Sequence, residues 1–112
     1  MSSFLEQIEK MKLPKVPAPQ VPESVFRAAE SLGLTVLITS TSAPEQYELT
    51  RNGDASGYVR VRWGEMSVTY PDAGDEILYE GPVSGFGGFE EHERKAKLLF
   101  ALDLIATRML ST

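Results

Sequence analysis

The chain has 112 residues, no cysteine and a formal net charge of −5 at pH 7. This length suits one domain, and a hydrophobic content of 42% is enough to form a core. The lack of cysteine excludes disulfides, thiolate nucleophiles and cysteine-ligated metals, while the acidic balance disfavours binding to phosphate backbones. No apolar run is long enough to span a bilayer, and the N-terminus lacks a signal peptide's apolar centre, so the sequence predicts a cytoplasmic protein without membrane contact.

Residues 1–21 are expected to form an arm, in which an amphipathic helix over 3–12 precedes a proline-rich strap. Ser3 and Glu6 have the spacing of a capping box, and the prolines that follow favour extended backbone. A helix this short is marginally stable alone, so its apolar side must dock on the domain or on a partner. That side carries Phe4, Leu5, Ile8 and Met11.

Residues 22–112 are predicted to form a single α+β domain. Helical spacing of apolar residues indicates a helix over 22–32 and a long one over 89–110. Between them the pattern changes to a period of two, and the short links favour antiparallel pairing. The predicted fold is an antiparallel four- to five-stranded meander packed against a long C-terminal helix, with one or two N-terminal helices. Its strands are expected at 34–40, 46–51, 57–63, 66–70 and 76–80.

The strand over 57–63 alternates most clearly, which predicts two distinct faces. Arginine and tyrosine on its outer face are typical of protein interaction sites. They also suit stacking on bases. The simpler interpretation is a solvated face whose arginines pair with Glu48 or Thr50 across the hairpin, and both remain open. We expect Val59, Val61 and Trp63 on the inner face, and Tyr58, Arg60 and Arg62 on the outer one.

The C-terminal helix carries more apolar surface than one sheet contact requires. Its main seam is expected to face the sheet, but Phe100 and Leu104 fall beside that seam. Either the N-terminal arm or a partner should cover them, and the sequence favours neither. The seam consists of Leu98, Leu102, Ile105 and Met109.

Three features could suggest chemistry, and each has a simpler explanation. The glycine-rich stretch 81–88 matches no phosphate-binding motif, and the acidic helix start behind it would repel a phosphate. His92 is the only histidine, has no ligand partner at helical spacing, and is predicted to be exposed. Asp72 and Asp75 lack the spacing of a calcium loop and suit a turn.

The sequence therefore predicts a non-catalytic protein-binding protein. Its partner is another protein or a second copy of the chain, and no cofactor, metal or catalytic residue is expected. It could be an accessory or structural subunit of an assembly, or an inhibitor or immunity-type protein. The alternatives are a nucleic-acid-binding module, which the negative charge disfavours, and a small enzyme of unknown reaction; a small-molecule ligand stays open. The candidate partner-binding residues are Phe4, Leu5, Ile8, Met11, Tyr58, Arg60, Arg62, Phe100 and Leu104.

Overall fold

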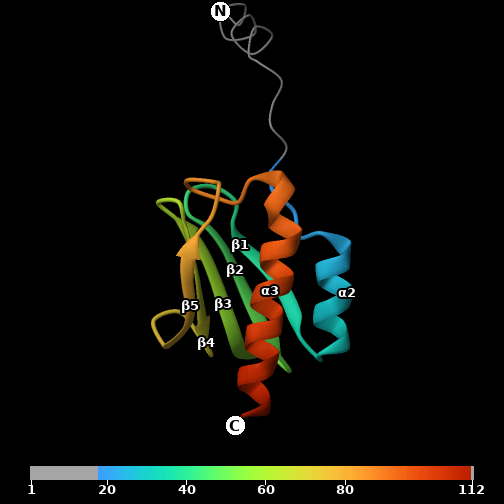
Figure 1. Cartoon of the computed structure of the whole chain (residues 1–112). Coiled ribbons are helices and arrows are strands. Elements are labelled where there is room, and N and C mark those ends of the chain that lie inside the picture. The colour runs from blue at the N-terminus through green and yellow to red at the C-terminus, as the bar shows by residue number, and fades with distance from the viewer. Residues whose placement is uncertain (1–17, 112) are drawn as a thin grey trace, which may run out of the picture.

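The computed structural model describes residues 18–111, which form five strands and two helices. The strands make one antiparallel sheet in the order of the sequence, and both helices lie on the same face of it (Figure 1). This confirms the predicted α+β meander with its C-terminal helix, while the helix expected over 3–12 lies outside the described residues. The elements are α2 (Glu23–Ser31), β1 (Thr35–Ser40), β2 (Glu45–Arg51), β3 (Asp54–Arg62), β4 (Glu65–Tyr70), β5 (Glu76–Pro82) and α3 (Glu91–Leu110).

The core lies between the sheet and the two helices, because alternate residues of each central strand are apolar and point to that side. α2 contributes Val25 and Ala29 to it, and α3 lies across β3 and β4. A side chain on Gly57 of β3 would meet Ile105 of α3 at 2.5 Å, so glycine allows this close approach. The buried side chains of the central strands and α3 include Tyr47, Leu49, Val59, Val61, Met66, Val68, Leu98, Ala101, Leu102 and Ile105.

The prediction that Trp63 faces the core is wrong. β3 ends at Arg62, and Trp63 and Gly64 form a two-residue hairpin turn with φ angles of 58° and 75°. The turn breaks the alternation, so Trp63 does not follow Val59 and Val61 inward and is 68% exposed. The alternation of inward and outward side chains holds only within the strand, and the first residue of the turn is exposed at the surface.

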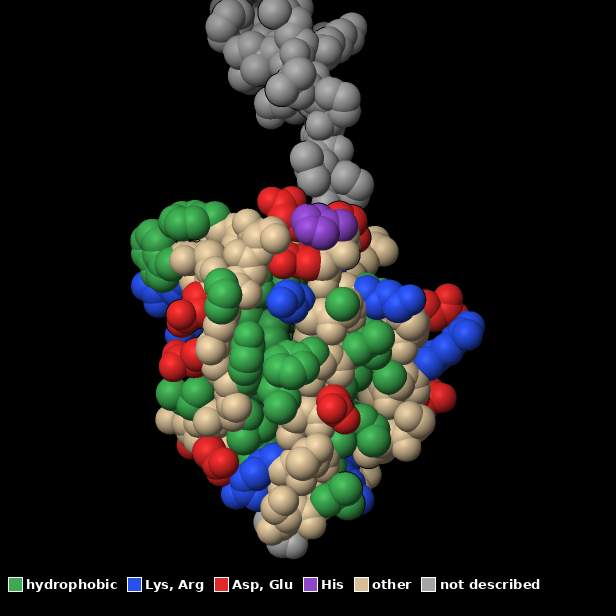
Figure 2. Space-filling view, viewed as in Figure 1, with side chains coloured by type: hydrophobic (Ala, Val, Ile, Leu, Met, Phe, Trp, Pro, Cys, Tyr) green, Lys and Arg blue, Asp and Glu red, His purple; other side chains and the backbone are tan. Residues whose placement is uncertain are grey.

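Several smaller predictions agree with the structure. His92 is exposed on the first turn of α3 (Figure 2). The Asp72 carboxylate accepts the backbone N–H of Ala73 at 2.8 Å, as expected for a turn residue. The glycine-rich stretch begins inside β5, and its loop covers residues 83–90. Within residues 18–111, neither helix is long and apolar enough to cross a membrane.

Candidate interaction surface

The face of the sheet opposite the helices carries Tyr58, Arg60 and Arg62, as the alternation predicted. Strand register places Arg60 between Gln46 of β2 and Ser67 of β4, while Glu48 lies opposite Tyr58. Within the described residues, neither arginine side chain forms a hydrogen bond or an ion pair. The expected pairing with Glu48 or Thr50 is therefore absent. Burial raises the pKa of the neighbouring Tyr58, so its hydroxyl remains a donor at neutral pH.

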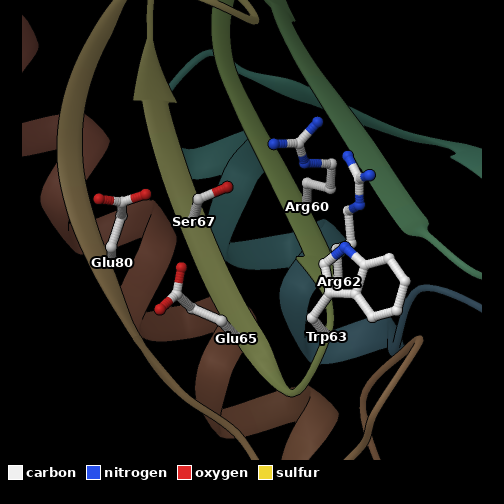
Figure 3. A pocket seen from close by; sticks show the side chains of 6 residues that line it. All are labelled: Arg60, Arg62, Trp63, Glu65, Ser67 and Glu80. Atoms are coloured by element: carbon white, nitrogen blue, oxygen red, sulfur yellow. The ribbon is translucent and has the colours of Figure 1, made fainter.

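Two shallow depressions flank the arginines. The first has a volume of about 290 Å³ and runs across β3, β4 and the edge strand β5. In Figure 3, Arg60 and Arg62 extend on the β2 side of β3, whereas the carboxylates of Glu65 and Glu80 lie over β4 and β5. Charges of opposite sign thus line opposite sides of this depression without joining across it.

The second depression has a volume of about 470 Å³ and lies between β2, the end of β3 and the glycine-rich loop. Its aromatic wall is formed by Trp63 and by Phe86, which is 67% exposed. The two rings meet edge to face with centroids 5.7 Å apart, and the guanidinium of Arg62 lies 5.4 Å from the Trp63 ring. No carboxylate of residues 18–111 lines it; the lining residues are Ala43, Pro44, Gln46, Arg60, Arg62, Trp63, Phe86 and Gly87.

Backbone hydrogen bonds hold this wall in place. Gly64 N–H donates to the carbonyl of Phe86 at 2.7 Å, and Val83 N–H donates to the carbonyl of Gly64 at 3.0 Å. The loop also packs against the segment before β2, where a side chain at Gly87 would meet the Ala43 methyl at 2.5 Å. The hairpin turn and the loop are therefore joined, which fixes Trp63 beside Phe86.

Beneath the loop, on the helix side of the sheet, lies a buried ion pair that the sequence did not indicate. The side chains of Arg94 and Glu45 are 4% and 3% exposed. Arg94 Nε donates to Glu45 Oε2 at 2.9 Å and its Nη2 donates to Oε1 at 3.1 Å, which makes a bidentate pair. The hydrogen bond with Glu45 is the main reason that the pKa of Arg94 is raised.

Further groups form hydrogen bonds with the carboxylate oxygens of Glu45 and with the remaining N–H groups of Arg94. Phe89 N–H donates to Glu45 Oε1 at 3.2 Å, and Arg94 Nη2 donates to the Phe89 carbonyl at 3.0 Å. The Tyr47 hydroxyl donates to Glu45, and Arg94 also donates to Glu91. Burial and the Glu45 carboxylate raise the pKa of Tyr47, so this hydroxyl stays protonated. The pair therefore connects β2 to the end of the loop and the start of α3.

Glu93 anchors the other half of the loop. Its carboxylate accepts the backbone N–H groups of Ser84 and Gly85, both at 2.9 Å, and that of Glu90 at 2.8 Å. Burial acts to raise the pKa of Glu93, but the three N–H donors outweigh it and the pKa is lowered. Glu93 belongs to the acidic helix start noted in the sequence, and it also forms a capping box with Glu90 and holds the loop.

Two signals could have found the buried pair. Glu45 stands two residues before Tyr47, in phase with the inward-facing positions of β2, and Arg94 stands four residues before Leu98 on the apolar seam of α3. A charged residue in phase with a buried stripe requires a partner. Phe86, the other residue missed, stands in a loop where no periodicity applies.

The remaining predicted partner-binding residues lie elsewhere. Phe100 and Leu104 are on α3, across the sheet from the arginines. Phe100 is half exposed and its ring meets Tyr79 of β5 at 4.9 Å, while Leu104 is partly buried against the core. Figure 2 shows apolar side chains at the surface between α3 and β5. The structure thus brings Tyr58, Arg60 and Arg62 together on the open face, and it places Phe100 and Leu104 on the other side of the sheet. The remaining predicted residues lie outside the described part of the chain: Phe4, Leu5, Ile8 and Met11.

Comparison with known proteins supplies no further guide. No protein-family model, no curated protein and no solved structure matches this chain. Within residues 18–111, no cluster of three or more histidine or acidic side chains has the arrangement of a metal site. The open face of the sheet is consequently the strongest candidate for a functional surface.

Proposed function

We propose that this chain is a non-catalytic protein-binding module whose contact surface is the open face of the sheet around Arg60, Arg62, Trp63 and Phe86. The single observation that carries the proposal is that two neighbouring arginines lack carboxylate partners in residues 18–111 and lie beside two exposed aromatic rings. Tryptophan, tyrosine and arginine are the residues that contribute most to protein interfaces. A guanidinium has five N–H donors and no acceptor, so these arginines can donate to an acceptor on a partner in exchange for water.

The backbone of Trp63 gives independent support. The left-handed conformation costs a bulky residue roughly 1–2 kcal/mol, and hairpin turns of this kind favour asparagine or glycine instead. Trp63 is mostly exposed and contributes nothing to the core. A residue that breaks a local preference without adding to the core is expected at a functional site.

A protein partner suits this surface better than nucleic acid. Glu48, Glu65 and Glu80 stand on or beside the same face, and the chain carries a net charge of −5. A polyanion would be repelled along most of its length, whereas a protein can present charges only where they match. The exposed aromatic rings and arginines still favour nucleic acid as the second candidate, whose binding would weaken steeply with salt.

Affinity capture from the native cell tests the proposal. The bait is the tagged full chain, compared with Arg60→Ala/Arg62→Ala and with Arg27→Ala as the matched control. Arg27 is an exposed arginine on α2, which lies on the other face of the sheet. The double variant should lose a reproducible set of proteins that the wild type and the control retain. Equal capture by all three baits would exclude this face as the contact surface.

The assembly and inhibitor versions of the function predict different behaviour in isolation. An assembly subunit should be oligomeric or aggregation-prone alone, whereas an inhibitor should be a stable monomer, and light scattering after size exclusion separates them. The expected N-terminal arm remains part of the proposal. Its test is a deletion that stops at residue 17, because Val21 packs against the core.

A further inference from the structure

We propose that the depression between β2, the end of β3 and the glycine-rich loop binds an acidic segment of a partner protein, with a carboxylate placed on the arginines and an apolar side chain on the aromatic wall. This inference rests on the proposed function and names the chemistry of its partner. Among the residues that the structure describes, the depression is lined by two cationic side chains and by no anionic one. It is therefore a locally positive site on an acidic protein.

The charge distribution selects the side of β3 on which the acid binds. On the β5 side, Glu65 and Glu80 line the first depression and would repel a carboxylate (Figure 3). On the β2 side, Gln46 is the polar neighbour, and its amide can donate as well as accept. Glu48 of β2 lies on the same face but outside this lining. Within residues 18–111, an anion in the second depression thus meets Arg60 and Arg62 without contacting an acid.

The apolar part of the lining limits the ligand further. Trp63, Phe86 and Pro44 form a wall next to the guanidinium groups. An aromatic or aliphatic side chain of the partner can pack there while a neighbouring acid meets the arginines, which combines a buried anchor with a polar contact. A bare anion such as inorganic phosphate would leave this wall exposed to water.

The buried pair on the other face of the sheet shows how an arginine binds a carboxylate in this protein. Arg94 holds Glu45 through two parallel hydrogen bonds, with the Phe89 carbonyl taking a third donor. Arg60 and Arg62 have the same donors and no such acceptor in residues 18–111. The geometry of a guanidinium fork matches a carboxylate better than any neutral acceptor.

The site is also held in place before anything binds. Glu93 accepts three backbone N–H groups of the loop, and Phe86 is bonded through its carbonyl to the hairpin turn. Little backbone conformational entropy is then lost when a ligand packs against Trp63 and Phe86. Such a wall can bind a short extended segment and does not need a large interface.

Titration of the ¹⁵N-labelled full chain with defined peptide pools tests this inference. Each pool consists of short blocked peptides randomised over Phe, Leu, Gly and Ser, together with either Asp and Glu, Asn and Gln, or Lys and Arg. A deoxythymidine oligonucleotide forms a fourth probe. Trp63 is the only tryptophan in the chain, so its single indole N–H resonance reports on the site directly.

The acidic pool should shift the Trp63 indole resonance at lower concentration than the other pools. In Arg60→Ala/Arg62→Ala the apparent affinity should fall about tenfold or more, whereas Arg27→Ala should change it by less than about twofold. Equal shifts with the amide pool, no shift at millimolar acidic peptide, or tighter binding of the oligonucleotide would each overturn the inference. When the titration is negative, the capture experiment shows which proposal has failed. If the double variant still loses captured proteins, the open face binds a partner but not through an acidic segment. If the double variant loses none, the open face is not the contact surface.

Discussion

Arg94 and the pair Arg60 and Arg62 lie on opposite faces of one sheet, in contrasting surroundings. Arg94 is almost completely buried and holds Glu45 through both oxygens. Arg60 and Arg62 are partly or fully open to solvent and make no ion pair within the described residues. One arginine thus has its donors satisfied inside the molecule, and the other two present theirs outward.

The contrast assigns different roles to the arginines: Arg94 contributes to stability, and Arg60 and Arg62 are available for binding. A buried charge is tolerated only when it is paired, so Arg94 and Glu45 must form together and thereby fix the loop against β2. The exposed arginines contribute little to folding and remain free to bind. The buried cluster indirectly serves the open face, because the loop that it fixes carries Phe86 to Trp63.

Breaking the buried pair should have the largest effect. Arg94→Met leaves the Glu45 carboxylate buried without its cation, so the free energy of unfolding should fall by about 3–5 kcal/mol. Urea denaturation measures this. The control Arg27→Met removes an exposed ion pair with Glu23 and should cost less than about 0.5 kcal/mol. A similar small loss for Arg94→Met would mean that the pair does not hold the fold.

Removing the loop anchor should have a smaller effect. Glu93→Gln replaces an ionised acceptor of three backbone N–H groups and should lower the free energy of unfolding by about 2 kcal/mol at pH 7. Because the pKa of Glu93 is lowered in the folded state, its contribution is present above pH 4.5 and is lost as the pH falls through the folded value. The variant should therefore lose less stability than the wild type on acidification. Parallel pH profiles of the two proteins would contradict this assignment.

Relieving the hairpin turn should separate stability from binding most clearly. Trp63→Asn has two opposite effects on stability. It relieves the strain of a bulky residue in the left-handed conformation, and it removes the ring contact with Phe86. Each effect is worth about 1 kcal/mol. Thermal unfolding should therefore change little, while capture of the partner should be lost. A strongly destabilised variant would show that Trp63 supports the fold and not the surface.

The smallest effect on stability is expected for Arg60→Ala/Arg62→Ala. Neither guanidinium has a hydrogen-bond partner in residues 18–111, and the contact of Arg62 with the Trp63 ring is exposed, so the free energy of unfolding should change by less than about 1 kcal/mol in total. Chemical denaturation alongside the wild type checks this. A loss comparable to that of Arg94→Met would remove the contrast between the two faces.

Much of the fold could be predicted because periodicity is a local property. The alternation in β3 placed Val59 and Val61 inside and Tyr58, Arg60 and Arg62 outside, and the structure agrees. The same rule failed at Trp63, since the strand ends one residue earlier and the turn reverses the chain. The position at which a strand ends is set by the turn that follows it, and the alternation within the strand carries no information about that turn.

The candidate site was harder to predict because its parts are far apart in sequence. Arg94 and Glu45 are 49 residues apart, and no local pattern pairs them. Phe86 reaches Trp63 only because the loop after β5 folds back onto the β3–β4 turn. The arginines were found from the strand alone, whereas their aromatic neighbour required the tertiary structure.

Photo-crosslinking in the native cell tests the proposed contact surface most directly. A photoreactive phenylalanine analogue is introduced in place of Phe86, which keeps an aromatic ring beside Trp63, or, as the matched control, in place of Phe26, an exposed phenylalanine on α2. The open-face position should give a discrete crosslinked protein that the α2 position does not. Crosslinks from the α2 position alone, or none from the open face, would contradict the assignment of that face to binding.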